Sequence, residues 1–143
     1  MSCGALCVRS VQVATSGESV LAASRRMAEA GVGSVVVLGD TQRPVGIVTD
    51  RDVAVRCVAA ARDPATTTLA EVMTAPVTCV YEATPLEEAL ARMAGAHTRR
   101  LVVVDAQERL VGILALDDML ELLAEEAASI GRIVAARGAE RRA

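Results

Sequence analysis

Two residues with suitable chemistry for holding a small molecule, Thr49 and Asp52, stand three positions apart where a β-rich run gives way to a helical pattern. Unpaired N–H groups at a helix N-terminus favour a phosphate, and a carboxylate can accept two hydrogen bonds from the neighbouring hydroxyls of a ribose. The same residue types also serve helices as N-terminal cap and first-turn acid. The local sequence therefore leaves two interpretations open, a nucleotide-binding site and a structural cap.

The stretch around these residues occurs twice. VGIVTDRD at residues 45–52 returns 66 positions later as VGILALDD at residues 111–118. The register continues without a gap from the pair 11/77 to the pair 56/122, and 13 of these 46 pairs are identical. Such a repeat predicts two copies of one supersecondary unit, which pack together and bury surfaces that neither can bury alone.

Each copy is predicted to contain a strand, a helix, two strands and a second helix. Apolar residues at helical spacing predict the first helix, which opens in the second copy with a capping pattern at residues 84–87 and ends near Gly31 or His97. Continuous apolar runs predict strands covered on both faces, each followed by the return strand of a hairpin. These runs and return strands lie at residues 35–38, 45–49, 101–104 and 110–115, and the last helices at about residues 50–61 and 117–128.

The fold class is accordingly α/β in the mixed, α+β sense, with two pseudo-symmetric β-α-β-β-α units packed sheet to sheet. The predicted boundaries are a first repeat at residues 8–62, a linker at 63–72, a second repeat at 73–130 and a tail at 131–143. Within the linker, a capping box at residues 68–71 predicts a short helical turn. The tail is expected either to extend the last helix or to fray.

Composition restricts the possible functions. The net charge is −3 and the 15 basic residues, all arginine, are scattered among 18 acids, which argues against a nucleic-acid partner. No stretch reaches the roughly 20 apolar residues of a membrane span, and no signal peptide is visible, so we expect no membrane partner and a cytoplasmic location. With one His and no Cys–His–acid constellation, neither a catalytic nor a metal site is expected; Cys3 and Cys7 lack a second ligand pair.

The repeated unit resembles the CBS domain, the cystathionine-β-synthase type of repeat, present as the tandem pair often called a Bateman module. The resemblance covers about residues 8–128. It rests on the order of elements, on Val72-Met73-Thr74 before the second copy, on the strand at residues 100–105 and on the Gly-hydrophobic-x-Thr-x-x-Asp signature at residues 46–52. Membership would imply ligands that contain adenosine, namely AMP, ADP, ATP, S-adenosylmethionine or NAD-like molecules, bound in clefts between the two copies.

The resemblance also implies roles for the matching residues of the first copy. Asp52 would hold the ribose hydroxyls, and Thr49 would contact the ribose or a phosphate. Ile47 and Val48 would line the slot for the base with backbone and apolar surface.

The two copies differ where the resemblance places ligand contacts. Ala115 replaces the signature threonine in the second copy, although Asp118 keeps the carboxylate. Gly33-Ser34 stand in the first copy where the second has Arg99 and Arg100, the candidates for holding phosphates. We therefore expect unequal clefts, with the Asp118 cleft the weaker one, and the arginines can serve either cleft or both.

Two functions are compatible with this sequence. The first is a regulatory module that senses an adenosine-type ligand, needs no cofactor, and signals to a regulated protein of unknown identity by a change of shape or partner affinity. The second is a CBS pair without ligand that acts as a structural adaptor. For both, the resemblance implies a homodimer, with the last helices, including residues 117–128, as a possible contact.

Overall fold

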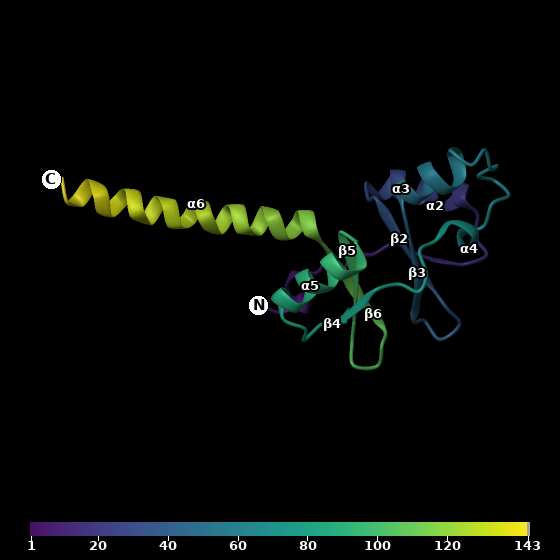
Figure 1. The fold of residues 1–143 in the computed structure, drawn as a ribbon, viewed down its shortest axis with the longest axis horizontal. Helices are drawn as coiled ribbons and strands as arrows, with labels where there is room; N and C mark the ends of the chain where they lie inside the picture. Colours follow the sequence, from purple (N-terminus) through teal and green to yellow (C-terminus); the bar gives the residue numbers. More distant parts are fainter. Residues whose placement is uncertain (143) are drawn as a thin grey trace.

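A computed structural model describes residues 1–142 and contains two copies of one α/β unit. The first copy consists of β1 (Val13–Thr15), α2 (Val20–Ala30), β2 (Ser34–Leu38), β3 (Pro44–Thr49), the single turn α3 (Asp50–Asp52) and a π-helical continuation (Val53–Val58). The second consists of β4 (Cys79–Tyr81), α5 (Leu86–Ala96), β5 (Arg100–Val104), β6 (Leu110–Ala115) and α6 (Leu116–Glu140). Two short helices, α1 (Cys3–Leu6) and α4 (Leu69–Val72), precede the copies. The predicted order of elements is confirmed in both copies (Figure 1).

Each copy forms a three-stranded sheet with the same topology. The strand order is β1-β2-β3 in the first copy and β4-β5-β6 in the second. The first strand runs parallel to the central strand, and the hairpin partner runs antiparallel to it. The register repeats as well, since Val36 pairs with Ile47 and Val102 pairs with Ile113. Parallel neighbouring strands need a crossover connection. α2 supplies it between β1 and β2, and α5 supplies it between β4 and β5.

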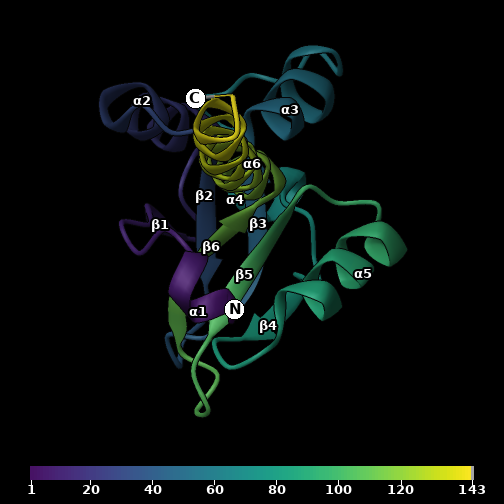
Figure 2. The same cartoon turned by 90° about the vertical axis from the view of Figure 1, so that its left-hand side faces the viewer.

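The two sheets pack against each other through one face. Val36, Val102 and Val104 form a buried cluster between them, and Ile47 and Ile113 pack against this cluster. The opposite face of each sheet belongs to the core of its own copy. The apolar runs of β2 and β5 are continuous because neither face of these central strands meets water. The predicted sheet-to-sheet packing is confirmed, and Figure 2 shows the strands of both copies between α2 and α3 at the top and α5 on the right.

The segment that precedes each copy packs on the other copy. α4, which leads into the second copy, contributes buried Leu69 and Val72 to the core of the first. α1, at the start of the chain, contributes buried Cys3 to the core of the second. Cys3 stands 66 positions before Leu69, so this exchange follows the repeat. The segment predicted as a linker thus holds part of the first copy's core.

Gly46 and Gly112 allow these exchanged segments to lie directly on the sheets. Thr74 forms an isolated bridge with β3, and Val8 forms the equivalent bridge with β6. A Cβ atom at Gly46 would lie 2.6 Å from Met73 Sδ, and one at Gly112 would lie 2.5 Å from the carbonyl oxygen of Val8. The close backbone approach predicted for the signature glycine is confirmed.

The predicted capping box at the start of α5 is wrong. The helix begins at Leu86 with Pro85 as its N-cap, and no side chain caps it. Thr84 is buried, and its carbonyl accepts a hydrogen bond from the Cys3 N–H of the exchanged segment. The backbone at Thr84 therefore follows its tertiary contact with α1 and not the local capping preference.

Other local signals are confirmed. α2 and α5 end at Gly31 and His97, both in the left-handed conformation, with φ of 64° and 50°. α4 opens with the predicted capping box, in which Thr68 N–H donates to Glu71 Oε2 at 2.7 Å. The hydrogen bonds from Thr68 lower the pKa of the Glu71 carboxyl, because they stabilise its charged form.

The last helices of the two copies differ more than the sequence predicts. In the first copy the π-helical segment ends at Val58, short of the expected end near residue 61. In the second copy α6 runs for 25 residues to Glu140. It therefore continues through most of the tail, and Figure 1 shows it leaving the body of the molecule. Within residues 1–142, no helix combines the length and the apolar character that crossing a membrane requires.

Candidate functional site

A cavity of about 500 Å³ lies between the two copies, at the junction of β3 and α3. From the first copy it is lined by Ile47, Thr49 and Asp52, and from the second by Arg99 and Arg100. Five of the seven predicted site residues thus share one cavity, although they come from distant parts of the sequence. The remaining lining residues are Arg51, Thr74, His97 and Thr98. We call this cavity the Asp52 cleft.

Thr49 and Asp52, which both line this cleft, form a capping box. Asp52 N–H donates to Thr49 Oγ1 at 3.2 Å, while Thr49 N–H and Oγ1 both donate to Asp52 Oδ2, at 2.9 and 3.1 Å. Asp52 Oδ1 takes no part in the box and lies 3.8 Å from Arg56 Nε. The structural cap that the sequence allowed is therefore present, and it leaves one carboxylate oxygen available to a ligand.

The two arginines reach the Asp52 cleft from the start of β5. Arg99 is exposed and forms an ion pair with Asp117 in the first turn of α6. Arg100 is partly buried, and its backbone N–H donates to Thr98 Oγ1 at 3.3 Å. Within residues 1–142, the Arg100 side chain has no carboxylate within 4.0 Å. An arginine of this kind retains its capacity to hold an anion.

The prediction that the apolar side chain of Val48 lines the slot is wrong. Successive side chains of a strand point to opposite faces. Ile47 faces the cleft and the inter-copy cluster, so Val48 points into the core of the first copy, where it is 0% exposed. Only the backbone of Val48 remains for the role assigned to it.

A second, smaller cavity occupies the pseudo-symmetric position. Its volume is about 230 Å³, and its lining includes Asp118, Ala115, Ile113 and Arg100. Ala115 is the N-cap of α6 and makes no side-chain cap bond. Asp118 is exposed, in contrast to the partly buried Asp52. The predicted asymmetry of the two copies is thus visible in the local geometry, and Arg100 borders both cavities. We call this cavity the Asp118 cleft.

Several lining residues of the Asp52 cleft escape the sequence analysis. Thr74 lies there because the segment after α4 bridges to β3, and Thr98 because it precedes β5. The repeat offered a signal for Thr74, because it stands 66 positions after Val8 and so takes the equivalent place before its own copy. His97 was predicted to be a helix-end residue, and it is one, but it also borders the cleft.

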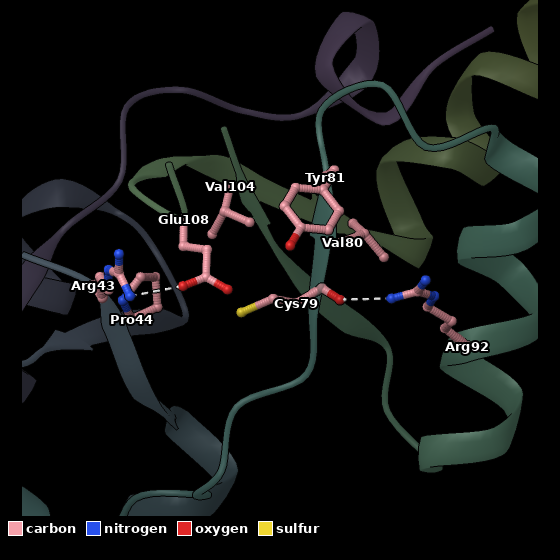
Figure 3. A pocket seen from close by; sticks show the side chains of 8 residues that line it. All are labelled: Arg43, Pro44, Cys79, Val80, Tyr81, Arg92, Val104 and Glu108. Atoms are coloured by element: carbon pink, nitrogen blue, oxygen red, sulfur yellow. Dashed lines mark hydrogen bonds and ion pairs between the residues drawn. The ribbon is translucent and has the colours of Figure 1, made fainter. Parts of the chain in front are cut away.

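A third cavity, of about 330 Å³, lies at the far end of the interface and was not predicted (Figure 3). Its charged groups are already paired. Arg43 Nη1 lies 2.8 Å from Glu108 Oε2, and Arg92 Nη1 donates to the carbonyl of Cys79 at 3.1 Å. Burial raises the pKa of the Cys79 thiol, with a smaller contribution from Glu108, so the thiol stays protonated near neutral pH. The third cavity is therefore the poorer candidate for binding an anion.

The comparison with known proteins identifies the fold family. The sequence model of the CBS domain matches residues 3–58 and 69–125, once for each α/β unit. This chain belongs to the CBS domain family. It carries a tandem CBS pair, and the family that matches it is defined by a CBS domain and not by a catalytic domain.

Several known proteins are similar to this one in sequence. Hypoxic response protein 1 of Mycobacterium tuberculosis is 34% identical over 110 residues, which cover 77% of this chain and 76% of that protein. A protein of Methanopyrus kandleri is 31% identical over 122 residues, which cover 85% of this chain but only 62% of the relative. This chain thus spans less than two thirds of the length of the Methanopyrus protein.

Two solved structures show the same fold. The crystal structure of Hypoxic Response Protein I, with two coordinated zinc ions, matches with a TM-score of 0.75 and 29% identity over 85% of this chain and 98% of that one. The cytosolic domain of the Mg²⁺ channel MgtE, in complex with ATP, matches with a TM-score of 0.71 and 29% identity over 85% of this chain and 48% of that one. In the described part of the present chain, no group of three or more His, Cys, Asp or Glu side chains is placed to hold a metal ion.

Proposed function

We propose that this CBS pair is a regulatory module that binds an adenosine-containing nucleotide in the Asp52 cleft. The observation that carries the proposal is the meeting of a carboxylate, a helix N-terminus and two arginines in one cavity between the copies. A nucleotide offers ribose hydroxyls and phosphates, which match the carboxylate and the cations respectively. The ATP complex of the related MgtE domain supports this ligand class.

The capping box and ligand binding are compatible in this cleft. Both bonds from Thr49 use Asp52 Oδ2, so Oδ1 can accept a hydrogen bond from a ribose hydroxyl while the box stays closed. The box holds the carboxylate in one orientation before the ligand arrives, which reduces the entropy lost on binding. The cap is therefore part of the proposed site, and the two interpretations of the sequence merge.

Arg99 provides a path from the cleft to α6. Its ion pair with Asp117 joins two side chains that are 68% and 70% exposed, and exposed pairs of this kind contribute only about 0–1 kcal/mol. A phosphate offers a stronger, bidentate partner for a guanidinium. A phosphate-bearing ligand would thus draw Arg99 away from α6, and this difference between free and bound states is what a regulatory ligand needs.

The test is a panel of AMP, ADP, ATP, S-adenosylmethionine and NAD, read by the melting temperature of the protein. A ligand at 100 times its dissociation constant adds about 2.7 kcal/mol to the stability, which corresponds to a rise of roughly 5–10 °C for a chain of this size. We expect Asp52→Asn to abolish most of the rise. Asn keeps a carbonyl oxygen for the cap but loses the charge and the second carboxylate oxygen.

The matched control is Asp118→Asn, the equivalent substitution in the Asp118 cleft. We expect it to leave most of the ligand-induced rise in place, because that cleft is smaller and its carboxylate is not held by a cap. Equal losses in the two variants would contradict the preference for the Asp52 cleft. No response of the wild type to any nucleotide would favour the structural adaptor instead.

A further inference from the structure

α6 extends far beyond the copy to which it belongs. Its 25 residues make a rod of about 38 Å at 1.5 Å per residue, and every residue from Leu123 to Arg142 is exposed. Figure 1 shows the distal part alone in space, and Figure 2 looks nearly along it. Most helical stability in proteins comes from tertiary packing of an apolar face, and among residues 1–142 the distal half of α6 has no such packing.

An apolar stripe runs along α6 from Leu120 to Val134. Leu120, Leu123, Ile130 and Val134 are between 51% and 64% exposed, and Ala127 stands between them in the sequence. Their spacing alternates between three and four residues, which is the pattern of a coiled-coil seam. Single exposed apolar residues need no explanation, but a stripe with this periodicity indicates a helical partner.

The flank beside the stripe has small residues in the distal half. Gly131 and Gly138 lie inside α6, and a Cβ atom at either position would meet nothing within 4 Å among residues 1–142. Glycine weakens a helix interior, and no contact in this described part of the chain requires it here. Glycine at these two positions would let a second helix approach α6 closely.

The distribution of charge along α6 favours a second copy of α6 as the partner helix. Residues 117–126 contain five acids and no base, namely Asp117, Asp118, Glu121, Glu125 and Glu126. Residues 127–142 contain four arginines and one acid, namely Arg132, Arg137, Arg141, Arg142 and Glu140. Two parallel copies of α6 would set acid against acid, whereas two antiparallel copies set the acidic half of each against the basic half of the other.

We propose that α6 pairs with α6 of a second copy of this chain in an antiparallel coiled coil. In the register that aligns the apolar stripes, Ala127 of each helix faces Ile130 of the other, and Leu123 faces Val134. Leu120 then faces Arg137, whose aliphatic stem can cover it while the guanidinium approaches the acidic half. This pairing does not depend on the nucleotide proposed above, so either proposal can fail alone.

Disulfide trapping tests the orientation. At 1.5 Å per residue, position 127 lies about 4.5 Å along the axis from its own equivalent in the antiparallel pair, and position 134 about 16.5 Å. We expect Ala127→Cys to form a crosslinked dimer under mild oxidation and Val134→Cys to remain uncrosslinked. A mixture of Leu123→Cys and Val134→Cys chains should crosslink to each other. The wild type controls for its own cysteines, of which Cys3 and Cys57 are buried.

Analytical ultracentrifugation tests the interface itself. We expect the wild type to sediment as a dimer that weakens with added salt. Ile130→Glu should raise the dissociation constant about 100-fold or more, because it buries an unpaired carboxylate in the seam. Ala136→Glu, on the opposite side of the helix, adds the same charge and should leave the dimer intact.

Three outcomes would overturn this proposal. A monomeric wild type would show that α6 has no such partner. A dimer that tolerates Ile130→Glu would place the interface elsewhere, and crosslinking of Val134→Cys to itself as readily as Ala127→Cys would make the helices parallel.

Discussion

In the Asp52 cleft, the side chain that closes the helix cap is also the proposed ligand contact. Asp52 donates its backbone N–H to the Thr49 hydroxyl and accepts from the same threonine through Oδ2, which leaves Oδ1 for a ligand. In the second copy the backbone is similar, with φ of −106° at both Thr49 and Ala115, but the hydroxyl is absent. Without that hydroxyl, α6 has no side-chain cap, and Asp118 is exposed where Asp52 is partly buried.

We predict that Thr49→Ala destabilises the protein and that Ala115→Thr stabilises it. Loss of a side-chain N-cap costs about 0.5–2 kcal/mol, and creation of one in compatible backbone recovers a similar amount. The free energy of unfolding, measured in urea, checks both changes. Thr49→Ser keeps the hydroxyl and should be nearly neutral. A Thr49→Ala variant as stable as the wild type would show that the capping box contributes nothing to stability.

At the scale of elements, the exchanged segments decide how the copies are built. α1 and α4 each complete the core of the copy that they do not precede. Gly46 and Gly112 make this possible, since any larger residue would collide with the segment that crosses the sheet. The two collisions differ in kind: one is with the flexible side chain of Met73 and the other with the backbone of Val8.

We therefore predict that Gly112→Ala is more destabilising than Gly46→Ala. The carbonyl oxygen of Val8 is held by a hydrogen bond of 3.0 Å from Ile113 N–H, so it cannot move without breaking the bridge. The expected cost for Gly112→Ala is about 1–3 kcal/mol, as for other overpacked sites. Met73 can rotate away from the new methyl group at Gly46, which reduces the cost there. The denaturant midpoints of the two variants, compared with that of the wild type, decide the order. The reverse order would contradict the argued difference between the two collisions.

At the scale of the whole molecule, Arg100 joins the two clefts. It borders both cavities, whereas Arg99 borders only the Asp52 cleft. A single guanidinium cannot give its full set of donors to two phosphates at once. Two nucleotides bound together would thus compete for Arg100, and occupancy of one cleft would weaken the other.

We predict that Arg99→Ala and Arg100→Ala have different effects in titration calorimetry with a phosphate-bearing ligand. Arg100→Ala should weaken every site that is detected, by about 10–100-fold, since a hydrogen bond to a charged group contributes about 1.5–3 kcal/mol. Arg99→Ala should weaken the tighter site alone. Adenosine, which carries neither a phosphate nor a carboxylate, serves as the control ligand and should respond to neither change. If Arg100→Ala affects one site only, the clefts are independent.

The sequence by itself determined the repeat, the order of elements, the paired strands and the Thr49–Asp52 junction, because these depend on local spacing and on hydrophobic period. It misplaced the cap of α5 and the side chain of Val48, because the first depends on a contact with α1 and the second on which face of β3 meets the core. Only the tertiary structure brought Arg99 and Arg100 to the Asp52 cleft, and only there is the distal half of α6 seen to be exposed among residues 1–142. Both features depend on which segments far apart in the chain pack together, which no local pattern of residues specifies.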